Sequence, residues 1–405
     1  MARLLPKKLL LIVYCSLITF LSLAGSTNHF IQKDFVIGLW NAPERGDLDQ
    51  AYKQIADANF NLVVGTAATN ATGQLKLCEK YNLQALISAG VNDPVPDSPA
   101  FMGYMLADEP AAGAFPEWGK RADEVRVKHP GKLPYINLYP NYAPTWTFGG
   151  PTYDDYLTGF IKIVKAEVLS MDHYPVMRPD ADSRPSYRAN LESCRKVSLA
   201  ANIPFWNYFD AMPFNEHLDP TEAQLRWQIF TSIAYGAKGV LYFCYWSPRD
   251  TPFRKGGAVI TAEGLPTRHY DEARRINAEL KNWGPTLMKL KNTGVHLVTT
   301  TNANAIPTAS GLTNLAGISG DPTGTYLIGT FDSSGGTRAI IIVNDSYSYT
   351  GWLTVHFDAD LKHVQEVSKS NGQLAPVIDD SPDIPGLQLS FGAGDARLFI
   401  LPARK

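Results

Sequence analysis

The chain has 405 residues, of which 45% are hydrophobic and 19% charged, and its net charge is −2. This balance is typical of a globular protein of about two or three domains and excludes long fibrous or disordered stretches. With 37 basic and 39 acidic residues, the chain lacks the basic surplus of a nucleic-acid-binding protein, so we expect no nucleic-acid partner.

Residues 1–26 differ from the rest of the chain. Arg3, Lys7 and Lys8 precede an apolar run over residues 9–21, and small residues follow. This order is typical of a secretory signal peptide, and the apolar run is shorter than the ~20 residues that span a bilayer. An uncleaved membrane anchor is the alternative. We expect cleavage and a secreted protein, extracellular or periplasmic, that has no membrane contact afterwards.

Strand and helix patterns alternate through residues 27–292. The expected strands are Phe35–Trp40, Asn61–Gly65, Leu83–Ser88, Gly103–Ala107, Pro134–Leu138, Glu167–Met171, Pro204–Phe209 and Gly239–Tyr245. Helical patterns between and after them include Leu48–Ala58, Pro116–Lys128, Tyr153–Lys165, Pro185–Ala200, Glu222–Tyr235 and Arg268–Leu290. Eight strands joined by crossovers predict a (β/α)8 TIM barrel. Residues 89–101 contain three prolines, so we expect that crossover to lack a full helix.

An open, doubly wound sheet is the competing architecture for the same alternation. It requires a glycine-rich phosphate turn after a strand, and none of the eight strand ends supplies one. The barrel is therefore the preferred fold.

Residues 293–405 lose the helical period. Short strands are expected at His296–Thr300, Tyr326–Thr330, Ala339–Val343, Gly351–Phe357, His363–Glu366 and Ala396–Leu401. Turn residues such as those at 334–336 and 370–372 separate these strands. This spacing predicts a C-terminal antiparallel β-sandwich domain.

Active sites of such barrels form at the carboxyl ends of the strands, so the residues there are the candidates. Carboxylates and aromatic residues dominate these positions, whereas metal-ligand clusters, phosphate-binding loops and a serine elbow are absent from the sequence. We therefore expect no metal and no cofactor. Paired carboxyl groups with flat aromatic faces suit the cleavage of a glycosidic bond in a carbohydrate substrate.

Glu109 is the strongest catalytic candidate, because it follows Asp108 at the end of the fourth strand, where an ionised carboxylate resists burial. The alternative is that one of these acids caps a helix that starts at Pro110. Asp210, at the end of the seventh strand, and Asp172, at the end of the sixth, are equal candidates for the second catalytic carboxylate. Candidate substrate-binding residues are Trp40, Asn41, Asp108, Asn137, Tyr139, His173, Tyr174, Tyr245, Trp246 and Arg249.

Three segments carry a family resemblance. They are Asp108-Glu109-Pro110, Asp172-His173-Tyr174-Pro175 and the stretch from Ala234 to Phe243. With them the chain resembles barrel-type glycoside hydrolases of clan A, distantly the family 42 β-galactosidases. The resemblance implies that Glu109 is the acid/base and that the nucleophile position lies near Asp210. The chain departs from that pattern with Asp108 in place of an asparagine and with Asp210 in place of a glutamate.

A secreted glycoside hydrolase is the leading functional hypothesis. The departure at Asp210, an aspartate where the family pattern has a glutamate, motivates an alternative, a carbohydrate-binding pseudoenzyme on the same barrel. A polysaccharide lyase is a third possibility. It would need cations at the barrel mouth, for which Arg249, Arg254 and Lys255 are the local candidates.

Overall fold

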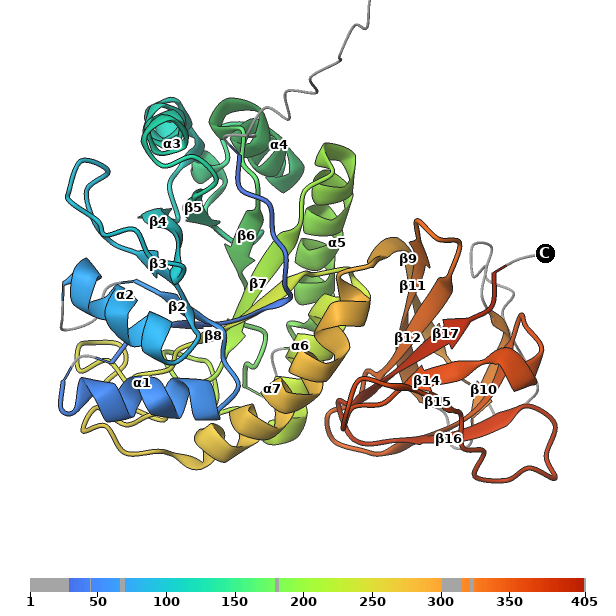
Figure 1. Ribbon diagram of the computed structural model, residues 1–405. Helices are drawn as coiled ribbons and strands as arrows, with labels where there is room; N and C mark the ends of the chain where they lie inside the picture. The colour runs from blue at the N-terminus through green and yellow to red at the C-terminus, as the bar shows by residue number, and fades with distance from the viewer. Residues whose placement is uncertain are drawn as a thin grey trace, which may run out of the picture.

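Figure 1 shows the computed structural model, which describes residues 29–43, 45–65, 70–178, 182–300, 315–320 and 324–403. The predicted signal peptide, residues 1–26, lies outside the described residues. None of the helices in the described ranges is both long and apolar enough to cross a bilayer.

The N-terminal part is a closed barrel of eight parallel strands in sequence order, which confirms the predicted fold class. The strands are β1 (Val36–Trp40), β2 (Leu62–Val64), β3 (Gln84–Ile87), β4 (Phe101–Asp108), β5 (Leu133–Leu138), β6 (Leu169–Asp172), β7 (Phe205–Asp210) and β8 (Gly239–Phe243). Around them lie α1 (Leu48–Asp57), α2 (Ala71–Lys80), α3 (Phe115–Lys128), α4 (Tyr153–Val164), α5 (Arg184–Ala201), α6 (Glu222–Ala234) and α7 (Arg268–Leu287). The segment between β3 and β4 contains no helix, as its prolines predict.

Polar side chains define where several of the outer helices begin. Asp47, Asn70, Thr152 and Thr221 each accept a hydrogen bond from a backbone N–H in the first turn of α1, α2, α4 and α6. Such caps satisfy amides that have no partner within the helix. Each cap marks where its helix begins, several residues after the preceding strand ends. The residues in between form connections at the mouth of the barrel.

The C-terminal part is an antiparallel sandwich, as predicted. Its strands are β9 (Leu290–Thr299), β10 (Leu315–Gly320), β11 (Thr325–Ser333), β12 (Arg338–Asn344), β13 (Gly351–Phe357), β14 (Gln365–Val367), β15 (Leu374–Pro376), β16 (Leu387–Phe391) and β17 (Ala396–Leu401). The order β15-β14-β17-β12-β11-β9 forms one sheet and β10-β13-β16 the other, and one apolar core joins both.

Strand β9 begins at Leu290 rather than at the predicted His296, so the predicted domain boundary at residue 293 lies inside it. The early part of β9 buries Leu290 and Asn292 and exposes the residues between and after them. Asn292 donates a hydrogen bond to the carbonyl of Ala234 at 2.9 Å. An inward position occupied by asparagine breaks the apolar alternation that marks a strand in sequence.

Helix α6 lies between the barrel and the six-stranded sheet, next to the orange and red strands of Figure 1. All of its residues from 227 to 234 are buried. Strand β11 approaches so closely that a β-carbon on Gly329 would lie 2.4 Å from the carbonyl oxygen of Ala234. Trp227 Nε1 also donates to Asp345 Oδ1 of the sandwich at 3.0 Å. The sandwich therefore supports the helix that packs behind β7.

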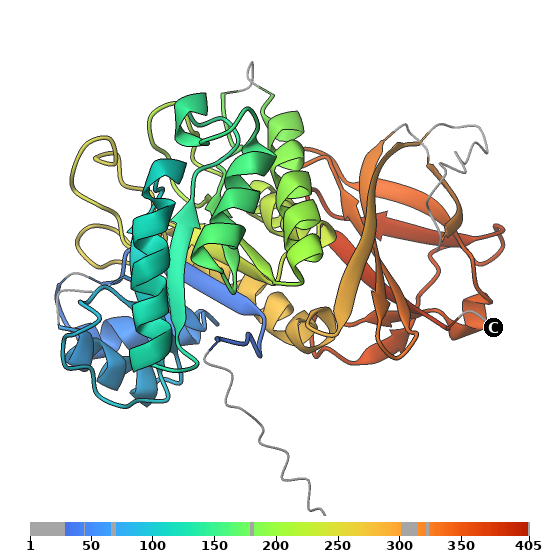
Figure 2. The ribbon, with the colours of Figure 1, turned by 90° about the horizontal axis from the view of Figure 1, so that it is seen from above.

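Figure 2 shows the connections at the mouth of the barrel. The green loop between β5 and α4 and the yellow connection between β8 and α7 project from the same end of the barrel. This is the end at which the parallel strands terminate, so residues that follow different strands meet there.

Candidate active site

Three carboxyl groups converge at the ends of β4 and β6. Asn137, near the end of β5, donates from Nδ2 to Asp108 Oδ1 at 3.2 Å and to Asp172 Oδ1 at 3.1 Å. Ser170 Oγ donates to Asn137 Oδ1 at 3.0 Å, which keeps the amide nitrogen turned toward the acids. The carboxyl group of Glu109 shares a hydrogen bond with that of Asp172. We refer to Asp108, Glu109 and Asp172 as the carboxyl cluster.

The backbone of Glu109 explains how two consecutive acids reach the same place. Glu109 has a left-handed conformation with φ of 47°, and its amide donates to the carbonyl of Asn137 at 2.9 Å. A residue with a side chain adopts this region at a cost of about 1–3 kcal/mol, and such residues cluster at functional sites. Neither acid caps a helix, because the helical turn at 112–114 and α3 begin after Ala111 and Ala114 without side-chain caps. The capping alternative is therefore wrong.

The surroundings of the cluster favour the binding of a proton to its acids. Burial, and then the charge of Asp108, raises the pKa of Glu109 to about 7, although its hydrogen bond with Asp172 acts in the opposite direction. Burial, and then the charges of Glu109 and Asp108, raises the pKa of Asp172 well above its usual value. The pKa of Asp108 is also raised by the surrounding protein, even though part of its side chain contacts solvent. Because Glu109 and Asp172 are in contact, the proton belongs to the pair.

Asp210 ends β7 and is fully buried. Its Oδ2 accepts from the backbone N–H of Val176 at 3.2 Å and lies 3.4 Å from His217 Nδ1. Gln228 of α6 bonds both the amide and the carbonyl of Asp210, at 3.0 and 3.1 Å. Burial raises the pKa of Asp210 to about 6, against the effect of His217. Among the described residues Asp210 Oδ1 has no hydrogen-bond partner, which is rare for a buried oxygen.

Tyr142, on the connection between β5 and α4, is a site residue that the sequence analysis missed. Its phenol lies near the carboxyl groups of Asp172, Asp210 and Glu109; burial, followed by these charges, raises its pKa. The ring contacts His173 edge-on at 4.9 Å between centroids, while 53% of the residue's surface stays exposed. The charges of both the carboxyl cluster and Asp210 therefore act on Tyr142. A lone tyrosine in a loop carries no periodic signal that would have identified it.

Tyr139 and Tyr174, predicted to bind substrate, lie beside the cluster. The charges of all three cluster acids add to burial in raising the pKa of Tyr139, and the phenol of Tyr174 lies close enough to Asp172 to oppose the rise in the pKa of that carboxyl. His173 is almost completely buried, with Nδ1 3.1 Å from Asn190 Oδ1. Burial lowers the pKa of His173 to about 4, so this ring is neutral at pH 7. The neutral ring packs against the ring of Tyr142.

The remaining predicted binding residues follow β1 and β8. Trp40 is half-buried, and Asn41 donates from Nδ2 to the backbone carbonyl of Trp246 at 2.9 Å. Tyr245 and Trp246 are 0% and 2% exposed and belong to the core, so neither ring is open to a sugar. The connection after β8 folds back and pairs with Trp246, which turns both rings inward. Arg249 is exposed on that connection.

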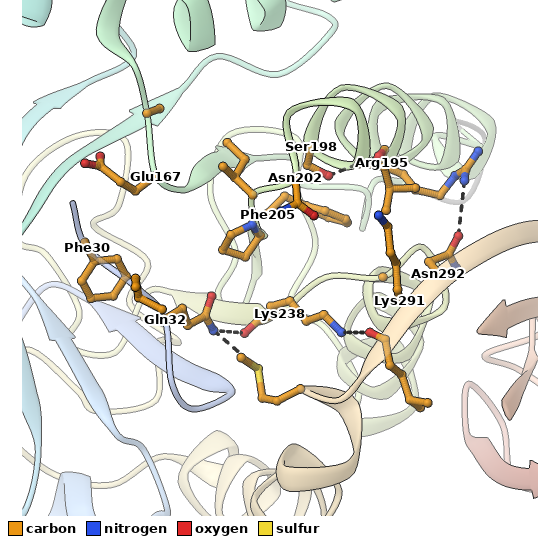
Figure 3. A pocket seen from close by; sticks show the side chains of 18 of the residues that line it. Phe30, Gln32, Glu167, Arg195, Ser198, Asn202, Phe205, Lys238, Lys291 and Asn292 are labelled. Carbon is orange, nitrogen blue, oxygen red and sulfur yellow. Dashed lines mark hydrogen bonds between the residues drawn. The ribbon is translucent and has the colours of Figure 1, made fainter. Parts of the chain in front are cut away.

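A pocket of about 610 Å³ lies at the opposite end, around the amino ends of β7 and β8 (Figure 3). Its acid, Glu167, accepts from Arg126 at 2.7 Å, and its buried lysine, Lys238, donates to the carbonyls of residues 287 and 290. This pocket therefore supplies no free acid and base. Among the described residues, no group of three or more His, Cys, Asp or Glu is arranged to hold a metal ion.

No protein-family model and no curated protein matches the chain. Among solved structures it is similar to a family 39 glycoside hydrolase from Bacteroides cellulosilyticus WH2, with 13% identity, a TM-score of 0.44, and 93% of this chain and 82% of that chain covered. A glucosidase from Croceicoccus marinus has 10% identity, a TM-score of 0.43 and coverage of 94% and 98%. A β-galactosidase from Marinomonas ef1 has 10% identity, a TM-score of 0.45 and coverage of 61% and 60%. These likenesses are too distant to assign an activity, so the residues of the site have to supply it.

Proposed function

We propose that the protein is a glycoside hydrolase in which Glu109 is the general acid. The carboxyl cluster is the observation that carries this proposal. It brings a partly buried carboxyl group to the barrel mouth with a pKa of about 7. A carboxyl group that is still protonated near neutral pH can donate its proton to the leaving oxygen of a glycosidic bond.

We assign the second catalytic carboxylate to Asp210 rather than to Asp172. Glycoside hydrolysis needs its two carboxyl groups about 5–5.5 Å apart for retention, or about 6.5–9.5 Å apart for inversion. Asp172 shares a hydrogen bond with Glu109, which leaves no space for a sugar between them. Asp210 comes from β7 and keeps one oxygen without a partner among the described residues. Asp172 is then a residue that positions the carboxyl group of Glu109.

The reaction follows from these roles. Glu109 transfers its proton to the glycosidic oxygen as the bond from that oxygen to the anomeric carbon breaks. The ionised Asp210 either bonds to the anomeric carbon or removes a proton from the water that attacks it. Because Asp210 is fully buried in this structure, a substrate has to displace part of the surrounding chain to reach it.

Paired substrates test the role of Glu109. In Glu109→Gln, kcat on glycosides with poor leaving groups should fall by about 10²–10⁴-fold, whereas dinitrophenyl glycosides should lose far less, because their leaving group needs no proton. Glu117→Gln, an exposed glutamate on α3, is the matched control. Wild-type hydrolysis that Glu109→Gln leaves unchanged on both substrates would refute the assignment.

One observation favours a second candidate, a carbohydrate-binding protein without catalysis. Asp210 is 0% exposed, and the hydrogen bond of Glu109 with Asp172 occupies the proposed acid. Glycan binding without turnover, in both the wild type and Glu109→Gln, would select this reading.

Two further points belong to the proposal and rest on sequence motifs alone. The first is membership of clan A, with the family 42 β-galactosidases as distant relatives. The second is export, directed by the signal peptide at residues 1–26. The mass of the protein recovered outside the cytoplasm tests export: loss of about the first 26 residues is expected. A protein retained in the cell with Met1 intact would contradict it.

A further inference from the structure

A second pocket, of about 510 Å³, is lined by residues of the connection between β8 and α7. This connection follows the carboxyl end of β8, and the carboxyl cluster lies at the carboxyl ends of β4 and β6, so both are at the same end of the barrel. Arg249, Arg254 and Lys255 line it together with polar groups such as those of Ser247 and Thr261. We call this the cationic pocket. Of its cations, only Arg249 is among the predicted substrate-binding residues.

The cationic pocket carries unneutralised positive charge. Its one acid, Glu263, pairs with Arg249 at 3.2 Å, and the same guanidinium contacts the carbonyl of Ala262 at 3.2 Å. Among the described residues, Arg254 and Lys255 have no ion-pair partner, and both are exposed. Two adjacent cations without partners in a concave surface attract an anion, and a guanidinium binds carboxylate or sulfate with two parallel hydrogen bonds.

The base of the pocket is held by hydrogen bonds. Ser247 donates to the carbonyl of Ile260 from both its backbone N and its Oγ, each at 2.9 Å. The same hydroxyl accepts from the amide of Ala258 at 3.3 Å, and residues 258–260 are fully buried. The backbone beneath the cationic pocket is therefore held by hydrogen bonds and by buried residues.

The connection that forms the pocket packs against the segment that follows Asp210. Gly257 has φ of 92°, and a β-carbon there would lie 2.7 Å from Cδ of Pro213. The ring of Phe253 packs 5.6 Å from that of Phe214. Because Arg254 and Lys255 directly follow Phe253, their position is tied to the segment that carries Asp210.

We propose that the cationic pocket binds an anionic group of the glycan, a carboxylate or a sulfate ester, and that the substrate is therefore an acidic polysaccharide. This inference rests on the proposed function, since it places the glycosidic bond at Glu109 and the acidic sugar unit at Arg254 and Lys255. A neutral glycan would leave both cations unused.

Binding to a catalytically disabled protein tests the pocket independently of turnover. In the Glu109→Gln background, titration calorimetry compares oligogalacturonides, sulfated galactan oligosaccharides and neutral galacto-oligosaccharides of equal length at low and high salt. An acidic oligosaccharide should bind about tenfold more tightly than the neutral one (~1.4 kcal/mol), and salt should reduce the difference. Adding Arg254→Gln and Lys255→Gln should abolish this preference. The control adds Lys120→Gln and Arg121→Gln, an exposed basic pair on α3, and should retain it.

Each outcome has a defined meaning. Preference for the uronate or for the sulfated oligosaccharide supports the pocket and identifies the anion. Equal binding of neutral and acidic oligosaccharides, or a preference that survives in the Arg254/Lys255 variant, overturns it. Wild-type hydrolysis of the same oligosaccharides is measured separately. Cleavage of neutral substrates as fast as acidic ones would support the proposed function and contradict the role of the pocket. Salt-dependent binding of acidic oligosaccharides without any cleavage would support the role of the pocket and contradict the proposed function.

Discussion

Replacing Asp210 by asparagine should make the protein more stable at alkaline pH. Burial raises the pKa of this carboxyl from the ordinary 3.8 to about 6 in the folded protein. An acid with a raised folded pKa favours the folded state at low pH, and this contribution is lost as the pH rises through about 6. At ~1.4 kcal/mol per pKa unit, ionised Asp210 costs the folded state about 3 kcal/mol at pH 8. The asparagine keeps an oxygen for the amide of Val176 and removes that cost.

Equilibrium denaturation in urea between pH 4 and pH 8 measures the effect. The free energy of unfolding of Asp210→Asn relative to wild type should rise with pH by up to about 3 kcal/mol, with most of the change between the ordinary pKa of 3.8 and the folded pKa of about 6. Asp383→Asn, at an exposed position of the sandwich, should follow the wild type. If Asp210→Asn also runs parallel to the wild type over this range, Asp210 is not the strained buried acid that we describe. In that case its assignment as the second catalytic group loses its support.

Three other substitutions probe the site. Asp108→Asn removes the charge next to Glu109, so the alkaline limb of the kcat/KM profile should move from near pH 7 to lower pH. The limb should stay above pH 4.5, the ordinary pKa of a glutamate, because burial is the larger cause of the raised pKa of Glu109. An unmoved limb in the pH–rate profile would show that Asp108 does not act on Glu109. Asn137→Ala removes the donor shared by two cluster acids, and we expect kcat to fall at least tenfold with an unchanged circular dichroism spectrum. Gly257→Ala would clash with Pro213 at a positive φ and should lower stability by about 1–3 kcal/mol in urea denaturation, a loss that a relaxed connection would not show.

The barrel could be predicted because its strands are short apolar runs separated by helical patterns, and six of the seven connections between its strands contain an α-helix. Strand β9 was harder to place. The first inward-facing residues of this strand are Leu290 and Asn292. Asn292 is buried because it donates a hydrogen bond to Ala234, but in the sequence an asparagine is typical of a loop. Tertiary contact overrides local pattern at that point.

The site was predictable where it depends on strand ends. Glu109 and Asp172 are at the carboxyl ends of β4 and β6, which a closed barrel brings together. The hydrogen bond between them was not predictable, since it depends on the left-handed backbone of Glu109. Tyr142 and Trp246 depend on how long connections fold: one loop carries a tyrosine to the acids, and the other turns a tryptophan into the core. Sequence spacing holds no information on either path.

Helix α6 limits how this protein can be taken apart. One side of the helix packs behind β7, where Gln228 holds the backbone of Asp210, and the other side meets the sandwich through Trp227. A barrel truncated before β9 would expose an apolar helix surface to water directly behind a proposed catalytic strand. The two halves are therefore poor candidates for domain shuffling, and engineering that alters specificity has to work at the mouth while the sandwich stays in place.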